Sequence, residues 1–247
     1  MAKRMISLII PLFNERENIL RYPSDLFPVV EKIGIECSES FEYLMIDDGS
    51  SDDTFQLISD FAANRPEVRV FHHEKNSGMG TAIRTGIKQV QGELIITLDS
   101  DLTFRPEDIR KLIAAYRRTG ADCISGSPYL EPGLLEEVTP FRLLMSRSVN
   151  LLYRILLGGN ISCVSPIFRL YRREIFDEIT ISSRNFEINA EIISKLLLKK
   201  KHVVEVPVPL LRRRHGTSKI RITKEIRNYL SLLSRIFMTK YFHRGWT

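Results

Sequence analysis

Two aspartates separated by one residue, Asp99 and Asp101, stand at the end of an apolar run, residues 94–98. In extended backbone, side chains two residues apart point to the same side, so both carboxylates could face one cation while Ser100 points away. Carboxylate oxygens suit a hard ion such as Mg²⁺ or Mn²⁺. An acidic pair at a strand end is also typical of a solvated turn or a helix N-cap. The pair alone leaves both interpretations open.

A second acidic segment, residues 47–52 with the sequence Asp-Asp-Gly-Ser-Ser-Asp, follows the apolar run 43–46. Its carboxylates can accept hydrogen bonds from a base N–H or from ribose hydroxyls. The structural alternative is a turn and the N-cap of the next helix. Both can hold together, with Asp48 contacting a nucleotide while Ser51 or Asp52 caps the helix.

Short apolar runs and helix-length segments alternate through the first half of the chain. The predicted strands are residues 5–10, 43–46, 68–71 and 94–98, and the predicted helices between them include 52–64 and 81–90. This alternation predicts an α/β fold with a mostly parallel sheet flanked by helices. Such sheets bind ligands outside the carboxyl ends of their strands, where the polar segments 11–15, 47–52, 76–80 and 99–101 stand. We therefore expect one site built from four strand ends.

The second half of the chain has a less regular pattern. It predicts helices at 107–118, 141–157 and 186–200, a strand near 123–125, and a strand at 203–210. Pro207 and Pro209 favour an edge position for that last strand. An amphipathic helix is expected at the C-terminus.

Composition restricts the class of protein. A chain of 247 residues with 43% hydrophobic content can bury a substantial core. Its three cysteines form no CxxC pair, so they indicate neither a disulfide framework nor a zinc site. The N-terminus lacks the pattern of a signal peptide, and the longest apolar segment, 143–157, is interrupted by Arg147 and Arg154. These features favour a cytoplasmic protein without a transmembrane helix.

The positive charge is concentrated near the C-terminus. The net charge is +6, and residues 210–247 contain ten Lys or Arg against the single acid Glu225. Such a segment could meet nucleic acid, anionic lipid or a phosphorylated substrate. Nucleic acid is disfavoured because the segment has no interleaved aromatic stacking motif and no recognisable recognition fold. The predicted C-terminal helix could lie on a membrane surface or pack on its own core.

In their order and spacing, four motifs resemble those of family 2 glycosyltransferases of the GT-A (Rossmann-like) fold. They are Pro-Leu-Phe-Asn-Glu at 11–15, the acidic segment 47–52, Asn-Ser-Gly-Met-Gly at 76–80 and Asp-Ser-Asp at 99–101. Further on, Glu-Val-Pro-Val-Pro at 205–209, followed by Arg213, Gly216, Ser218 and Lys219, is similar to the dolichyl-phosphate mannose synthase group and related polyprenyl-phosphate hexosyltransferases. The resemblance covers nearly the whole chain.

The resemblance implies roles for individual residues. Mg²⁺ or Mn²⁺ is expected at Asp99, Asp101 and Thr103. Catalytic roles, including contacts with phosphates, are expected for Asp99, Asp101, Arg142, Arg213 and Lys219. Contacts with the nucleotide sugar are expected for Pro11, Phe13, Glu15, Asp47, Asp48, Gly78, Ser100 and Ser218.

The resemblance also implies a function and a division of the chain. The expected reaction is inverting transfer of a hexose from GDP-mannose or a UDP-hexose to a polyprenyl or dolichyl phosphate. The alternatives are transfer to a saccharide acceptor and a non-catalytic subunit that binds nucleotide sugars. Residues 1–220 would form the GT-A domain, with a nucleotide-sugar half at 1–105 and an acceptor half at 106–220. Residues 221–247 would form a basic amphipathic helix, with peripheral contact at the cytoplasmic face of a membrane as an open alternative.

The chain departs from the pattern of that group at three places. Thr103 stands where a glutamine often helps to hold the metal, and Pro128 stands where an arginine is usual. Ser-Pro-Ile-Phe at 165–168 replaces a Ser-Gly-Phe pattern. These departures concern the surroundings of the phosphates and the acceptor.

A dinucleotide-binding oxidoreductase is a rival interpretation of Gly78-Met79-Gly80, but Ile83 occupies the place of the third glycine. His72 and His73 are adjacent in a predicted strand and so point to opposite faces, which argues against one shared metal ion. They are expected to be structural or incidental.

Overall fold

A computed structural model of the chain describes residues 3–136, 140–158, 161–215, 222–242 and 246. For residues 140–142 and 222–224 it describes the backbone alone. The backbone of Arg142 therefore lies in a helix, but its side chain is not described. Ser218 and Lys219, two of the expected site residues, lie outside the described residues.

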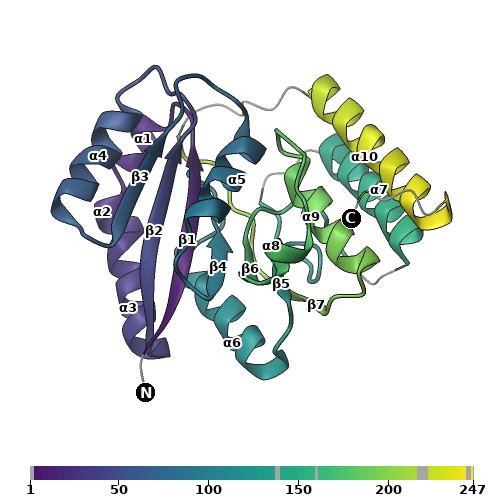
Figure 1. The fold of residues 1–247 in the computed structure, drawn as a ribbon, viewed down its shortest axis with the longest axis horizontal. Helices are drawn as coiled ribbons and strands as arrows, with labels where there is room; N and C mark the ends of the chain where they lie inside the picture. The colour runs from purple at the N-terminus through teal and green to yellow at the C-terminus, as the bar shows by residue number, and fades with distance from the viewer. Residues whose placement is uncertain (1–2, 137–139, 159–160, 216–221, 243–245, 247) are drawn as a thin grey trace.

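A seven-stranded sheet in the order β3-β2-β1-β4-β6-β5-β7 forms the centre of the molecule (Figure 1). The strands are β1 (Arg4–Leu12), β2 (Glu39–Asp47), β3 (Val68–His72), β4 (Leu94–Thr97), β5 (Cys123–Ser127), β6 (Arg169–Arg172) and β7 (Val203–Pro207). Neighbouring strands are parallel except at β6, which is antiparallel to both β4 and β5. The expected mostly parallel α/β sheet is confirmed, and β7 lies at its edge as the prolines predicted.

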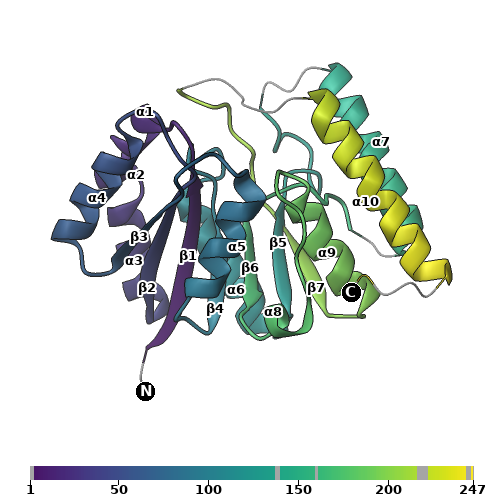
Figure 2. The same cartoon turned by 45° about the horizontal axis from the view of Figure 1, so that its top comes forward.

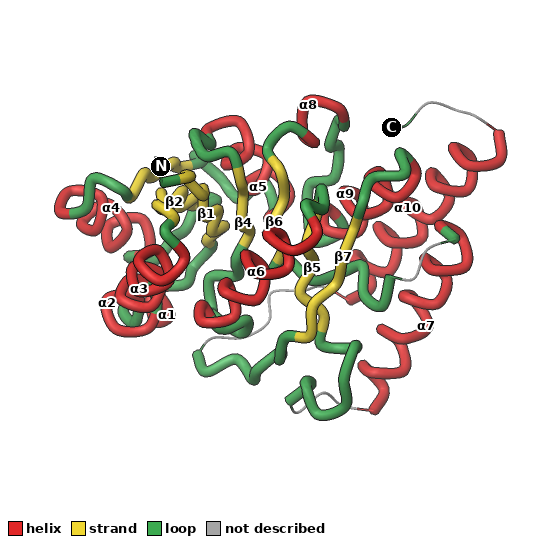
Figure 3. Tube along the Cα trace, turned by 90° about the horizontal axis from the view of Figure 1, so that it is seen from below, coloured by secondary structure: helices red, strands yellow, loops and turns green. Residues whose placement is uncertain are grey.

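Helices cover the sheet and extend beyond it. They are α1 (Arg16–Ile19), α2 (Tyr22–Asp25), α3 (Phe27–Cys37), α4 (Thr54–Asn64), α5 (Met79–Gln89), α6 (Ile109–Thr119, after a short 3₁₀ turn at Pro106–Asp108), α7 (Pro140–Leu157), α8 (Ile175–Glu178), α9 (Ile188–Leu198) and α10 (Ile222–Phe242). Seen from below, α5 and α6 flank the middle of the sheet (Figure 3). Because helices cover both faces, strand β1 is buried from Ile6 to Leu12, and Ser7 is the one polar residue in that run.

Helices α7 and α10 lie side by side at the β7 end of the molecule (Figure 2). The hydroxyl of Tyr153 on α7 donates to the carbonyl of Tyr229 on α10 at 3.2 Å, and Lys240 donates to the carbonyl of Leu156 at 2.7 Å. Ile236 of α10 is fully buried. The expected C-terminal helix is therefore present and packs on its own chain. In the described part of the chain, no helix is both long and apolar enough to cross a bilayer.

Two details of the sequence predictions were wrong. The helix expected at 52–64 begins at Thr54. Of the two capping residues expected, Asp52 rather than Ser51 bonds to its first turn, accepting from the backbone N–H of Thr54 at 3.0 Å. Residues 99–101 were expected in extended backbone, but β4 ends at Thr97 and Ser100 and Asp101 form a turn. The turn is followed by Leu102 in the left-handed region at φ 55°.

Candidate functional site

The loops after β1 and β2 are held together by side chains that bond to backbone. The N–H of Asn14 donates to the hydroxyl of Ser50 at 2.8 Å, and the N–H of Ser51 donates to the amide oxygen of Asn14 at 2.7 Å. Asn14 has a φ of 51°, a left-handed conformation that asparagine tolerates better than most residues. This pairing keeps the neighbouring Glu15 beside the carboxyl end of β2.

Asp47 is fully buried at the end of β2 and has partners within its own chain. Its carboxylate accepts from the N–H of Ser50 at 3.2 Å and lies 2.7 Å from Nδ1 of His72. His72 is the residue paired with Asp47 in the register of β2 and β3. In this structure Asp47 therefore fixes the turn that follows it.

Asp48, 2% exposed, joins the loops after β2 and β3. One carboxylate oxygen accepts from the N–H of Ser77 at 3.0 Å and lies 2.7 Å from Nδ1 of His73, while the other accepts from the N–H of Gly78 at 2.7 Å. The second ring nitrogen of His73 lies 2.9 Å from the hydroxyl of Thr85 on α5. The two histidines are thus the partners of the two aspartates, which the sequence interpretation missed. The parallel register of β2 and β3 would have been the signal.

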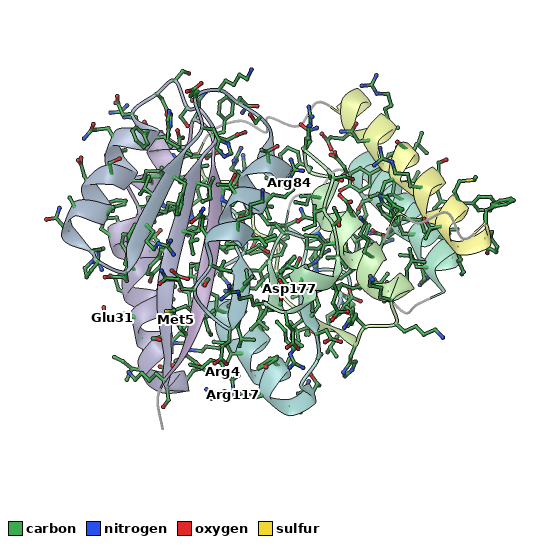
Figure 4. All side chains as sticks on the ribbon, in the orientation of Figure 1. Arg4, Met5, Glu31, Arg84, Arg117 and Asp177 are labelled. Atoms are coloured by element: carbon green, nitrogen blue, oxygen red, sulfur yellow. The ribbon has the colours of Figure 1, made fainter. Side chains whose placement is uncertain are left out.

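The amino end of α5 packs against the loop before α9. The N–H of Gly80 donates to the carbonyl of Arg184 at 2.8 Å, and that carbonyl also lies 3.3 Å from the N–H of Thr81. Nearby, Arg84 of α5 donates to the carbonyl of Ile181 at 3.2 Å (Figure 4). Because the first amides of α5 are engaged by protein, they do not form the open pyrophosphate cradle that the oxidoreductase interpretation requires.

Asp99 and Asp101 converge even though they lie in a turn. The N–H of Thr103 donates to a carboxylate oxygen of Asp99 at 2.6 Å and to one of Asp101 at 3.1 Å, and the Thr103 hydroxyl donates to Asp99 at 2.6 Å. The buried hydroxyl of Tyr22 donates to the carbonyl of Ser100 at 2.9 Å, which anchors the turn from α2. Thr103 thus holds the two expected metal ligands together.

The two carboxyl groups differ in proton affinity. Desolvation and the hydrogen bond with Asp101 raise the pKa of Asp99 well above its usual value. Desolvation alone would raise the pKa of Asp101 as well, but the hydrogen bond from Asp99 and the charge of Arg213 lower the pKa of that carboxyl overall. Burial therefore favours the neutral form of Asp99, whereas Arg213 favours the ionised form of Asp101.

Arg213 reaches this pair from a distant part of the sequence. Its Nε lies 2.6 Å from a carboxylate oxygen of Asp101, and its Nη2 lies 2.9 Å from one of Glu15. The other oxygen of Glu15 accepts from the side-chain amide of Asn18 at 2.6 Å. The arginine thus links the loop after β1 with the loop after β4.

The backbone just before Arg213 is attached to two loops. The N–H of Leu211 donates to the carbonyl of Thr103 at 2.9 Å, and the N–H of Leu210 donates to the carbonyl of Leu134 at 2.8 Å. These bonds hold Arg213 where it contacts two other expected site residues, Glu15 and Asp101.

The donor set fits a hard divalent ion that is shared with a substrate. In the described ranges, no three His, Cys, Asp or Glu residues group as a metal site. Asp99 and Asp101 offer two carboxylates, and Mg²⁺ is commonly bound by one or two carboxylates together with waters and substrate phosphates. The remaining ligands would then come from a diphosphate rather than from the chain.

Four of the other expected residues are described, and they stand at or after the ends of β1, β3 and β4. Pro11 is buried within β1, Phe13 is half-buried in the loop that follows, and Ser100 is 8% exposed in the aspartate turn. Gly78 has a φ of 96° and faces the backbone of Arg184 so closely that no side chain would fit.

The departures near residues 128 and 165 lie beside a second group of contacts. Glu205 of β7 accepts from the N–H of Ser162 at 2.7 Å and from that of Cys163 at 3.2 Å, and burial raises its pKa. The hydroxyls of Ser162 and Ser127 are 2.6 Å apart. Glu205 therefore fixes the segment before Ser165 against the end of β5, next to Pro128.

Comparison with known proteins gives both a family and a fold. The sequence model described as Glycosyl transferase family 2 matches residues 7–180. A dolichol-phosphate mannosyltransferase of Pyrococcus furiosus is 32% identical over 235 residues, which are 94% of this chain and 63% of that protein. A polyprenol monophosphomannose synthase of Mycolicibacterium smegmatis is 30% identical over 220 residues, 86% of this chain and 80% of that protein. The chain thus spans less than two thirds of the length of the first relative.

A solved structure supports the fold. Glucosyl-3-phosphoglycerate synthase from Mycobacterium tuberculosis, in complex with Mn²⁺, UDP and glucosyl-3-phosphoglycerate, superposes with a TM-score of 0.66 over 96% of this chain and 79% of that one. The identity is 17%, so this likeness concerns the fold alone.

Proposed function

The chain belongs to glycosyl transferase family 2, and we propose that it transfers a hexose from a nucleoside diphosphate sugar to a polyprenyl phosphate. The observation that carries this proposal is the contact of Glu15, Asp101 and Arg213 beside Asp99. Acidic groups for a metal and a guanidinium for phosphate oxygens are the two kinds of group that a sugar diphosphate requires. The names of the two relatives support a lipid-phosphate acceptor and mannose as the sugar, so GDP-mannose is the first of the expected donors to test.

The residues of the chain would divide the work as follows. Asp99 and Asp101, oriented by Thr103, would hold Mg²⁺ or Mn²⁺, which when bound offsets the charge that develops on the departing nucleoside diphosphate. Arg213 would contact the phosphates, and Glu15 would keep its guanidinium in the site. The loops fixed by Asp47 and Asp48 would form the nucleotide side of the pocket.

The acceptor step requires little help from a base. A phosphate monoester has a second pKa of about 6 and is largely ionised at neutral pH, so its oxygen is already a nucleophile. Attack on the anomeric carbon from the side opposite the leaving diphosphate would invert that carbon. Positioning by cationic groups then contributes more than proton removal.

A transfer assay tests this proposal. We expect transfer from one of GDP-mannose, UDP-glucose or UDP-galactose to a short polyprenyl phosphate with Mn²⁺, and its loss on chelation or in Asp101→Asn. Asp122→Asn is the matched control, because Asp122 precedes β5 at the amino end of the strand and accepts from the N–H of His202 at 2.8 Å. Transfer to a saccharide instead would support the alternative acceptor. Donor binding without transfer to any acceptor would support a non-catalytic subunit.

We also propose that α7 and α10 contact a membrane surface, where a lipid-linked acceptor would be found. Both helices expose large apolar side chains to solvent: Leu144, Met145, Leu151, Leu152 and Ile155 on α7, and Ile226, Leu230, Phe237, Tyr241 and Phe242 on α10. Exposed basic residues accompany them, among them Arg154 and Arg235. Apolar side chains with adjacent basic residues are typical of helices that lie in the headgroup region.

A further inference from the structure

We propose that Arg213 is a resident cation of the metal site, which a divalent ion displaces only when a nucleoside diphosphate arrives with it. This inference rests on the proposed function, since it concerns the same metal and donor. Its consequence is that the chain binds the metal weakly by itself and tightly together with the nucleotide.

The guanidinium of Arg213 already pairs with Asp101, one of the two carboxylates that a metal would need, and with Glu15. Its Nη2 donates a charge-assisted hydrogen bond to Glu15 at 2.9 Å, and its Nε forms an ion pair with Asp101 at 2.6 Å. The side chain of Arg213 is 24% exposed, and those of Asp101 and Glu15 are 13% and 7% exposed. At such burial, water screens the charges weakly and the pairing is correspondingly firm.

The remaining oxygens of the aspartate pair are also engaged. Thr103 donates to both carboxylates, and the N–H of Phe104 lies 3.4 Å from Asp99. An ion that coordinates Asp101 therefore competes with Arg213 for the same carboxylate. An ion and a guanidinium on that carboxylate would also repel each other at short range.

The displaced side chain would stay inside the site. The backbone two residues before Arg213 is bonded to Thr103, which itself holds the aspartate pair. A released guanidinium would therefore remain within side-chain reach of the metal position, and a diphosphate bound there would supply new oxygens in the bidentate geometry that arginine favours. The nucleotide thus provides the partner that Arg213 loses when the metal enters.

This exchange couples the two ligands thermodynamically. If the nucleotide raises the affinity for the metal, the metal raises the affinity for the nucleotide by the same factor. Without the guanidinium, the metal alone meets no competitor at Asp101 and binds more tightly. With metal and nucleotide both bound, the diphosphate lacks its arginine partner and binds less tightly. The coupling factor should therefore shrink from both sides.

Titration of the full-length, metal-free chain with MnCl₂, followed by the electron paramagnetic resonance of free Mn²⁺, measures this coupling directly. It is performed alone and with saturating GDP or UDP. For Arg213→Met we expect Mn²⁺ affinity without nucleotide to increase about tenfold, and the enhancement by nucleotide to fall by at least that factor. Arg213→Lys keeps a cation near Asp101 and should stay close to the wild type.

Arg214→Met is the matched control. It removes the same charge from the adjacent residue, whose side chain is 67% exposed and lies 4.0 Å from Asp25. Equal Mn²⁺ affinities for Arg213→Met and Arg214→Met without nucleotide would overturn the exchange, as would weaker binding in Arg213→Met. If the wild type with GDP or UDP binds no Mn²⁺, the metal-dependent function itself fails, and this inference with it.

Discussion

His73 lies between two elements of the nucleotide side of the site. Its ring nitrogens lie 2.7 Å from Asp48 and 2.9 Å from Thr85, and it is 17% exposed at the side chain. Asp48 in turn accepts the amides of Ser77 and Gly78. The orientation of that loop therefore depends on a histidine that is expected to touch no ligand.

We predict that His73→Ala weakens the binding of GDP or UDP about tenfold without unfolding the protein, because Asp48 loses one partner and the loop at 77–78 loses its fixed position. Isothermal titration calorimetry measures the affinity, and far-UV circular dichroism checks the fold. His202→Ala, at an exposed histidine before β7, is the control. Equal affinities for the two variants would show that His73 does not position the loop.

The contribution of single residues could be predicted only where residue type and local spacing determine it. The convergence of Asp99 and Asp101 was expected from their spacing, although a turn held by Thr103, not extended backbone, brings it about. Arg213 contacts Glu15 across 198 positions of sequence, and the resemblance of its segment suggested a contact with phosphate rather than with Asp101 and Glu15. Contacts of that range depend on the packing of loops that no local pattern encodes.

The close approach of α5 to the loop before α9 requires glycine. A Cβ at Gly78 would clash with the Arg184 carbonyl, and one at Gly80 would lie 2.8 Å from the backbone of Ser183 and Arg184. Gly120 also has a positive φ, 60°, but has open space around its Cβ position. Gly78 and Gly120 therefore share a positive φ, but their ψ angles, 149° and 22°, and their contacts differ.

We predict that Gly78→Ala lowers the free energy of unfolding by about 3 kcal/mol or more, because it adds a backbone clash to an unfavourable φ. Gly120→Ala should cost about 1 kcal/mol, since the φ alone penalises it. Urea unfolding measures both. Equal losses would mean that the loop before α9 moves away freely, and that the site does not depend on this contact.

At the level of elements, the first half of the fold could be predicted better than the second. The predicted runs in β1, β2 and β4 are largely apolar and buried, and such runs can be read from sequence. Strand β6 was missed because it is four residues long and begins with Arg169. That arginine is fully buried and donates to the carbonyls of Val164 and Asn189 at 2.7 and 2.5 Å. A segment that begins with an arginine is not recognised as a buried strand from sequence, because the contacts that satisfy the guanidinium come from distant parts of the chain.

Helix α3 was missed for a different reason. It follows two short helices without a polar N-cap, and its first residues are Phe27 and Pro28. Its apolar residues Phe27, Val30 and Ile33 do have helical spacing and are buried. The periodic signal was therefore present, but the boundary signals that separate such a helix from its neighbours were absent.

On the scale of the whole molecule, the candidate site and the apolar side chains of α7 and α10 lie at different ends of the sheet. Loops after β1, β2 and β4 form the site, whereas α7 and α10 lie beyond β7 (Figure 1). Segment 210–213 leads from the β7 side back to Asp101. The division of residues 1–220 into two halves stays a prediction, since the sheet continues from β4 into β6 and β5 without a break.

We predict that Leu152→Glu with Leu230→Glu weakens binding to vesicles of phosphatidylcholine and phosphatidylserine at least about tenfold, because two apolar contacts are lost and two negative charges are added. Co-sedimentation measures it. Ile35→Glu is the control, since Ile35 is 69% exposed on α3, away from both helices. Vesicle binding that is unchanged in the double variant would reject contact through these helices.

The central claim is that the aspartate turn holds a divalent ion against the diphosphate of a bound nucleotide. Anomalous diffraction from crystals grown with MnCl₂ and GDP or UDP locates that ion independently of any activity. We expect one manganese peak coordinated by carboxylate oxygens of Asp99 or Asp101 and by both phosphates, with the Arg213 side chain moved from Asp101 to the diphosphate. A nucleotide bound elsewhere, or bound beside Glu15 with no manganese at the aspartate pair, would contradict the account.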